Sequence, residues 1–343
     1  MMNLNKYALP LIAAGFIALP ASAVQPVADE AGVSGFFQLG VGMVNVESNL
    51  LATAVGADLG DDTTDDLTES ADSEVSALPL LGLSVTYTFE NKSTELFFGS
   101  SIENFVRFDF ASSIGLRQAA GKAGIFELSA LATPLATEVW EDPYVTGASR
   151  DETDRTADGF RLEWGSIMGS GFDLQVSSRE VDIDDERSGD ALVAATTITA
   201  GEQGLLDRNG DIDIVKIVYN WQIEEGRILS IGARSFDHDL DGEAMAHDGS
   251  ALELTYAARL NATKRMVINF SVGSFDHDEE NPIYDEKDEA DTAGIAVTFF
   301  ATDPFGYKGW VGNAGFTFAE EDHDIDFYDN KAFLVSVGML RRF

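Results

Sequence analysis

The stretch that decides the fold is the end of the chain, Phe333-Leu334-Val335-Ser336-Val337-Gly338-Met339-Leu340-Arg341-Arg342-Phe343. Taken in steps of two back from Phe343, one set of side chains is largely apolar, and the intervening set is small or mixed. Because successive side chains of a strand point to opposite faces, this pattern predicts a strand with lipid on one side and a lumen on the other. An amphipathic strand at the end of a soluble β-domain would look similar, so the stretch alone leaves both interpretations open.

The other end of the chain favours the membrane interpretation. Residues 1–23 have the form of a secretory signal peptide: Lys6 supplies the positive charge, Tyr7–Pro20 is a short apolar run, and Ala21-Ser22-Ala23 is a cleavage site of small residues. The mature chain is expected to begin at Val24 and to form one domain, residues 24–343. No later stretch approaches the roughly 18 consecutive apolar residues of a membrane helix, so a membrane role requires a β-barrel.

With a terminal Phe343 and an export signal, the chain resembles Gram-negative outer-membrane β-barrel proteins. In general character it looks closest to an uncharacterised family of porin-like barrels with acidic outer loops from marine gammaproteobacteria. Arg341 departs from the apolar residue usual at its position. The resemblance implies a place in the outer membrane, contact with lipid and lipopolysaccharide, recognition by the barrel-assembly machinery, and passage of small solutes.

Composition narrows the functional classes. The chain of 343 residues has no Cys, which excludes disulfides, thiol nucleophiles and thiolate metal sites. The formal charge of −37 repels nucleic acid and attracts cations. The acidic residues gather in blocks that separate amphipathic segments, and the blocks fall on every second connection: Glu47–Glu74, Glu141–Asp158, Glu180–Asp190, Asp237–Asp248, Asp276–Asp291 and Glu320–Asp329.

The segments between these blocks predict an all-β fold, a transmembrane antiparallel up-and-down β-barrel of about 14 strands. An even number of strands places both termini and all short turns on the periplasmic side, and the long acidic loops outside. A short helix is expected in the loop at Ala191–Leu206, and a single strand at Gly124–Trp140. The clearest alternation runs from Val106 to Arg117 and predicts Val106, Phe108 and Phe110 on the lipid side.

The same alternation predicts which charged side chains point into the lumen. The inward positions that we expect to set selectivity are Arg107, Asp109, Arg161, Glu163, Arg179, Lys216, Arg234, Glu253 and Arg259. Charged rings inside a pore select ions. Facing Arg and Glu residues on neighbouring strands could equally form salt-bridge ladders that fill a closed barrel. The sequence leaves both interpretations open.

The acidic loops suggest a metal site. All four histidines fall in predicted outer loops, three of them inside Asp-His-Asp triplets at 237–239, 276–278 and 322–324. Asp237, Asp239, Asp241 and Asp248 stand at the spacing of an EF-hand calcium loop, with Gly242 at its sixth position. This spacing predicts Ca²⁺ at the outer loops. It ends in Asp rather than Glu and is flanked by strands, so a solvated acidic rim is the alternative.

No motif of a common enzyme class is present: there is no Gly-x-Ser-x-Gly elbow, no P-loop and no His-Glu-x-x-His. The sequence therefore indicates a non-enzymatic, porin-like channel for ion transport and passive diffusion of small solutes. The alternative is a non-conducting surface barrel whose acidic loops bind divalent cations or partners. A hydrolase with its site at the barrel rim is the third hypothesis.

Overall fold

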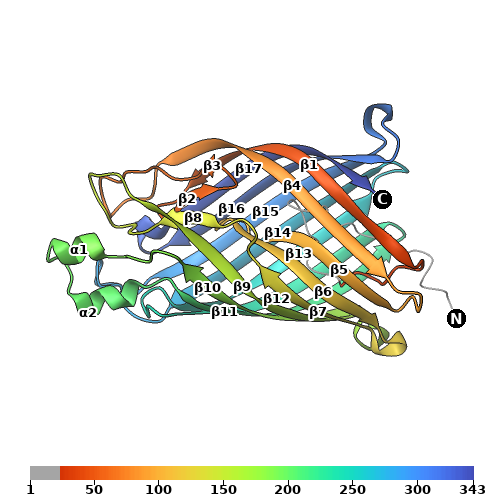
Figure 1. Cartoon of the computed structure of the whole chain (residues 1–343), viewed down its shortest axis with the longest axis horizontal. Helices are drawn as coiled ribbons and strands as arrows, with labels where there is room; N and C mark the ends of the chain where they lie inside the picture. The colour runs from red at the N-terminus through yellow and green to blue at the C-terminus, as the bar shows by residue number, and fades with distance from the viewer. Residues whose placement is uncertain (1–23) are drawn as a thin grey trace.

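A computed structural model describes residues 24–343, and the predicted signal peptide lies outside this range. The described chain forms an elongated barrel (Figure 1). Its fourteen long strands are β1 (Gly32–Glu47), β4 (Ser73–Thr88), β5 (Thr94–Asn104), β6 (Asp109–Ala119), β7 (Ile125–Ala132), β9 (Glu152–Gly165), β10 (Phe172–Ile183), β11 (Gly210–Glu224), β12 (Arg227–Leu240), β13 (His247–Arg259), β14 (Lys264–His277), β15 (Glu289–Thr302), β16 (Trp310–His323) and β17 (Asn330–Arg342).

Shorter elements lie in the connections. They are β2 (Leu51–Ala54), β3 (Ala57–Asp58), β8 (Thr137–Trp140), α1 (Asp190–Ala194), α2 (Ala200–Gln203) and the 3-10 turns η2 (Gly121–Ala123), η3 (Ile167–Gly169), η4 (Gly204–Leu206), η5 (Pro304–Gly306) and η6 (Asp326–Tyr328). The helices α1 and α2 confirm the helical segment expected near Ala191–Leu206. The single strand predicted at Gly124–Trp140 is wrong, because β7 and β8 are separate strands there.

The barrel closes where β1 pairs with β17, antiparallel from Phe36↔Arg342 to Glu47↔Lys331. The last residue completes this seam, because Gly35 and Phe343 exchange two backbone hydrogen bonds of 3.1 Å. Neighbouring long strands pair antiparallel in sequence order around the whole circuit. The predicted antiparallel up-and-down barrel of about 14 strands is therefore confirmed.

The two faces of β17 are those expected from its alternation. Val335 and Val337 point outward and are 46% and 56% exposed, whereas Leu334 and Ser336 point inward and are buried. The same holds around the wall, where large apolar side chains such as Leu39, Leu252 and Ile217 cover the outside. A soluble protein does not expose apolar surface on this scale, whereas a barrel in lipid requires it.

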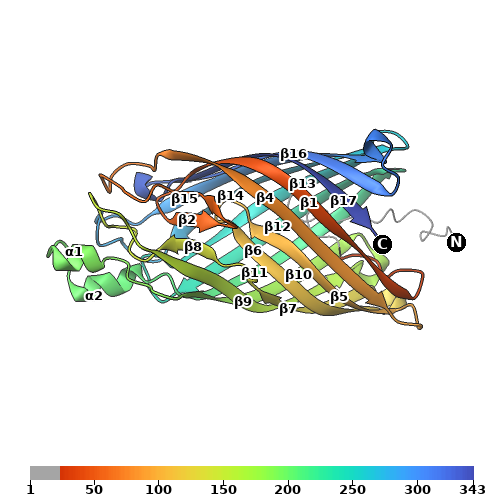
Figure 2. The same ribbon diagram turned by 45° about the horizontal axis from the view of Figure 1, so that its top comes forward.

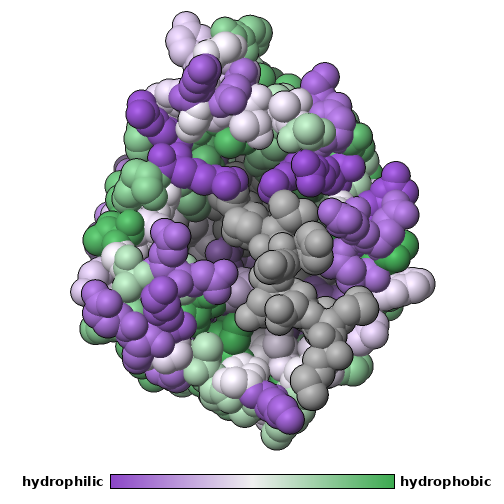
Figure 3. Space-filling model, turned by 90° about the vertical axis from the view of Figure 1, so that its right-hand side faces the viewer, coloured by the Kyte–Doolittle hydropathy of each residue, from purple (hydrophilic) through white to green (hydrophobic). Residues whose placement is uncertain are grey.

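The two ends of the barrel differ. Short turns and both ends of the described chain lie at one end, and the long connections lie at the other (Figures 1 and 2). Figure 3 looks onto the end with the turns, whose rim carries many hydrophilic residues. We call this the inner end and the opposite one the outer end. No helix in residues 24–343 is long and apolar enough to cross a membrane.

The wall is interrupted beside β4. This strand pairs with β1 over its whole length, from Gly32↔Thr88 to Glu47↔Ser73. On its other side it pairs with β5 only from Ser84↔Gly99 to Thr88↔Glu95, at the inner end. Farther out, the ends of β5 and β6 pair only with each other, and β2 and β8 pair beside β9. The outer ends of β5 and β6 have thus left the wall.

Candidate functional site

The interior of the barrel holds a chamber of about 750 Å³ with a lining rich in charged side chains. Eight of the nine predicted lumen residues line it: Arg107, Asp109, Arg161, Glu163, Arg179, Lys216, Arg234 and Glu253. The ninth, Arg259, lines a second cavity nearer the inner end. Apart from Arg107, which lies in a turn, these residues stand on strands with their side chains on the inward face.

A row of inward charges crosses neighbouring strands at one level. Glu95, Arg117 and Glu127 stand directly opposite one another on β5, β6 and β7. The Arg117 guanidinium bridges the two carboxylates, at 2.8 Å from Glu95 and 2.7 Å from Glu127. This triad was missed by sequence reasoning, although the inward parity of β5 and β6 could have identified it. With two carboxylates and one guanidinium, the triad carries one net negative charge.

The row continues on β11 and β12 with a different balance. Lys216 and Arg234 stand opposite each other, and one carboxylate, Glu253 on β13, serves both. The Lys216 ammonium lies 2.6 Å from Glu253, but the Arg234 Nε is 3.9 Å from it. The Arg234 guanidinium instead lies over the ring of Phe236 at 5.1 Å. This side of the chamber carries an excess of positive charge.

The turn between β5 and β6 reaches across the lumen. We call residues 100–111 the inward hairpin. The strand predicted from Val106 is wrong, because residues 105–108 form a turn and β6 begins at Asp109. Val106, Phe108 and Phe110, which were predicted to face lipid, are all buried. Arg107 is therefore presented by a turn within the lumen and not by the wall.

Ion pairs fix the inward hairpin to distant strands. Asp109 accepts two hydrogen bonds from the Arg179 guanidinium on β10, at 2.9 and 2.6 Å. Arg107 reaches Glu321 on β16 at 3.2 Å. A third pair joins Glu103 to Arg161 on β9. Because bidentate arginine–carboxylate pairs are strong and geometrically specific, these contacts hold the hairpin as a constriction of the lumen.

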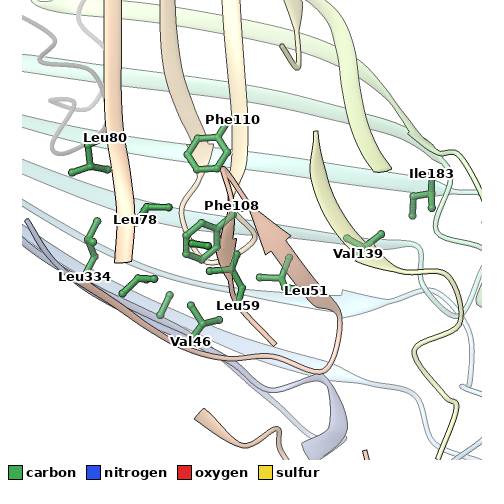
Figure 4. Close-up of a cluster of buried hydrophobic side chains, with 14 residues drawn as sticks. Val46, Leu51, Leu59, Leu78, Leu80, Phe108, Phe110, Val139, Ile183 and Leu334 are labelled. Atoms are coloured by element: carbon green, nitrogen blue, oxygen red, sulfur yellow. The ribbon is translucent and has the colours of Figure 1, made fainter. Parts of the chain in front are cut away.

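An apolar core fills the outer part of the lumen behind the hairpin. Phe108 and Phe110 pack there with inward side chains of the wall such as Leu78 and Leu80 on β4 (Figure 4). Segments of the first outer loop complete this apolar plug, which consists of Val44, Val46, Leu51, Ala54, Ala57, Leu59, Leu78, Leu80, Phe108, Phe110, Val139, Ile183, Ala332 and Leu334. The loop Glu47–Glu74 was expected on the outside. Its segment 51–59 contributes buried apolar side chains to the plug, whereas residues 61–74 are mostly exposed.

A second apolar cluster joins the remaining loops over the mouth. This loop cap comprises Tyr144, Leu192, Ile198, Leu206, Met245, Ile325, Phe327 and Tyr328. Tyr144 and Tyr328 share a hydrogen bond of 2.7 Å between their hydroxyls, and Asn281 donates to Tyr328 at 2.7 Å. Burial raises the pKa of both phenols, so they stay neutral. Plug and cap together close the outer end.

The four histidines lie on strands, which corrects their predicted place in loops. His238, His247, His277 and His323 stand on β12, β13, β14 and β16, on the inward face. Ring centroids are 4.3 Å apart from His238 to His247 and 4.9 Å from His247 to His277. In the triplets the pleat therefore turns each histidine inward and its aspartates to the exposed side.

The residues of the predicted calcium loop are spread along a hairpin. Asp237 and Asp239 are exposed on β12, Asp241 is exposed in the following turn, and Asp248 stands opposite Asp237 on β13. In residues 24–343, no group of three or more His, Cys, Asp or Glu side chains is placed to hold a metal ion. Calcium binding at these aspartates stays a prediction.

A family model described as "Protein of unknown function (DUF2860)" matches residues 32–341. No curated protein matches the chain. Among solved structures, a mutant of the TodX monoaromatic hydrocarbon channel is 10% identical, with 93% of each chain covered and a TM-score of 0.48. The DcaP outer-membrane channel of Acinetobacter baumannii is 12% identical, covering 96% of this chain and 100% of that one, with a TM-score of 0.43.

An anion-selective porin from Comamonas acidovorans is also similar. It is 12% identical, the match covers 92% of this chain and 100% of that chain, and the TM-score is 0.40. The fold assignment for the present chain rests on its own strand register.

Proposed function

The chain belongs to the DUF2860 family of proteins of unknown function, and from the chamber inside its barrel we propose that it is an outer-membrane channel for passive diffusion of small solutes. The observation that carries the proposal is the chamber itself. A barrel that served only as a scaffold could fill its lumen with packed side chains. Here about 750 Å³ is left open and is lined by charged groups.

The lining supports selection by charge. Ion pairs neutralise much of the wall, but Arg234 and Lys216 share a single carboxylate. The acidic outer loops concentrate cations near the mouth. The arginines inside the lumen then set the charge selectivity for the ions that reach the constriction. The inward hairpin places Arg107 at this narrow point. Passage requires the plug or the hairpin to move, so the channel is proposed to be gated at its outer end.

Planar-bilayer recording tests this proposal. Purified, folded protein is added to a bilayer in symmetric salt, with detergent alone as the control. Discrete conductance steps that alternate with a closed state are expected, because the structure has an open chamber behind a closed outer mouth. A well-folded barrel that carries no current under any applied voltage would refute the channel.

A second function is favoured by the closed outer end. The plug and the loop cap leave the outer mouth sealed, as a non-conducting surface barrel requires. In this role the exposed acidic loops would bind divalent cations or a partner at the cell surface. Absence of current, together with saturable cation binding to intact cells, would support this function over the channel.

Location and assembly follow from the surface and the seam. We propose that the barrel lies in the Gram-negative outer membrane after cleavage near Ala23, in contact with lipid and lipopolysaccharide. Its apolar exterior supports this location. The barrel-assembly machinery is the proposed partner, since Phe343 closes the seam with Gly35. Deletion of Phe343 should lower the outer-membrane yield; unchanged yield and unchanged heat-modifiable gel mobility would contradict this role.

A further inference from the structure

A second cavity lies inside the inner end of the barrel, and its lining differs from that of the chamber. It measures about 480 Å³ and lies among the inward faces of β12 to β17. Its wall is mainly apolar and includes Ile228, Val267, Phe300, Val311 and Leu340. An apolar surface inside a lumen that opens to water has an energetic cost unless something covers it. We call this cavity the inner vestibule.

Three arginines are the charged residues of the inner vestibule: Arg259, Arg265 and Arg342. No acidic residue lines it, although the whole chain has 59 acidic and 22 basic residues. None of the three forms an ion pair with any residue in 24–343. In the chamber, by contrast, Arg117, Arg161 and Arg179 all have carboxylate partners.

The register brings two of these charges together. Arg259 on β13 stands directly opposite Arg265 on β14. Like charges directly opposite each other on neighbouring strands destabilise the pair. A bound anion would remove this repulsion, and the guanidinium fork matches a carboxylate in two parallel hydrogen bonds.

We propose that the inner vestibule binds a small carboxylate with an apolar body. The arginines would take the carboxylate, and Val267, Phe300 and Leu340 would cover the apolar part. This arrangement has the composition of a ligand site, a mostly apolar wall with a few charged groups that fix orientation. Free phosphate would leave the apolar wall uncovered, and cations are repelled. The inference deepens the proposed channel by naming its solute class, and transport of that solute rests on the proposed function.

Calorimetric titration with 2-naphthoate tests the site on the full mature chain in a non-ionic detergent. Detergent alone gives the blank. Naphthylmethylamine supplies the same body with a positive head, and acetate supplies the head without the body. The test variant is R259Q/R265Q. The matched control is K264Q, because Lys264 is an exposed cation beside Arg265 that does not line the cavity.

Saturable naphthoate binding is expected in the wild type and in K264Q. In R259Q/R265Q the affinity should be roughly tenfold weaker or more, because the charge-assisted hydrogen bonds to the carboxylate are lost. Equal naphthoate affinity in R259Q/R265Q would overturn the proposal, and so would equal binding of naphthylmethylamine. Acetate binding as tightly as naphthoate would refute the apolar half of the site. Heat-modifiable mobility checks folding; if the double variant does not fold, R265Q alone is titrated against the same expectation.

Binding and conduction are measured separately. Naphthoate binding by a barrel that carries no current would uphold the site and refute the channel. Current through a barrel that does not bind naphthoate would refute the site and leave the channel standing.

Discussion

The wall of the barrel has a regular part and an interrupted part. From β10 to β17 each strand pairs with the next over most of its length, as from His247↔His277 to Arg259↔Arg265 on β13 and β14. From β4 to β9 the circuit is complete only near the inner end. In the regular part an apolar side chain on the outward parity faces lipid. At the outer end of β6, in the interrupted part, the same parity faces the apolar plug.

The difference shows what period-2 alternation can and cannot report. Alternation indicates that one face of a strand is apolar, but it does not identify what covers that face. Ile114, where β6 pairs with both β5 and β7, is 63% exposed and faces lipid. Phe110, on the same face of β6, is 6% exposed and packs in the plug. A strand that leaves the wall therefore keeps the sequence pattern of a strand that stays in it.

The largest expected effect comes from releasing the inward hairpin. Arg179→Ala removes the bidentate partner of Asp109 and leaves a buried carboxylate unpaired. Loss of one partner from a buried pair costs about 3–5 kcal/mol. We expect a lower temperature of heat-modifiable unfolding and faster hydrogen exchange over residues 100–111. If a channel forms, its open periods should lengthen.

A matched variant in the regular part gives the control. In Lys216→Ala, Glu253 keeps Arg234 as a neighbour at 3.9 Å. The Glu253 carboxylate is also only partly buried, so losing Lys216 leaves no fully buried charge unpaired. We expect a smaller loss of stability and no change of exchange in the hairpin. Equal effects of the two variants would contradict the idea that the hairpin is held by Asp109 and Arg179.

The second prediction compares two neighbouring leucines on β4. Leu80 is 1% exposed and packs in the plug, and Leu81 is 53% exposed on the outer wall. Leu80→Ala creates a cavity in a packed core, at a cost of about 2–5 kcal/mol. Leu81→Ala changes a side chain in contact with lipid and should cost less. Denaturant unfolding in lipid vesicles measures both. A larger cost at Leu81 would mean that the plug is loosely packed.

Much of the fold could be predicted from the sequence because it depends on alternation and turn spacing. The strand expected at the end of the chain is β17, which spans Asn330–Arg342, and both of its faces are as expected. The histidines were assigned to loops because the strands extend beyond the apolar band. β12, for example, continues to Leu240, so His238 is still part of the strand and points inward. Extending β12 by the same alternation would have placed it correctly.

The plug and the constriction could not be predicted in the same way. They depend on residues far apart in sequence, such as Arg107 and Glu321 in an ion pair, or Phe108 and Leu334 in one apolar core. The local pattern of 105–108 contains no signal for the partner strand. The inward parity of the charged residues on strands can be read from the sequence, because it needs no knowledge of the partner strand; Arg107, in a turn, is the exception. The sequence does not show how far along the barrel axis each of these side chains lies.

The third prediction concerns ion selectivity and compares an arginine of the inward hairpin with an arginine of the regular wall. Arg107 projects from the inward hairpin into the chamber, and Arg259 lies in the inner vestibule. Removing positive charge from the narrow point should shift the reversal potential in a salt gradient toward cations. We expect a larger shift for Arg107→Ala than for Arg259→Ala, and the largest for the double variant. Currents insensitive to all three would refute the residue assignment and leave the channel standing.

The smallest effect is expected at the exposed end of the regular part, where close pairing puts like charges together. Asp237 on β12 stands directly opposite Asp248 on β13, and both are exposed. Because like charges in this position repel, Asp248→Asn should stabilise the barrel by about 0.2–1 kcal/mol at low salt, and the gain should fade as salt screens it. Unfolding in low and high salt measures this gain.

The same variant tests calcium binding, since a cation held by Asp237, Asp239, Asp241 and Asp248 would reverse the sign of the effect. Millimolar Ca²⁺ should then stabilise the wild type more than Asp248→Asn, because the variant lacks one ligand. Mg²⁺ at equal concentration controls for screening. If Ca²⁺ and Mg²⁺ change both proteins equally, the four aspartates form no calcium site, and the acidic hairpin acts only through its summed charge.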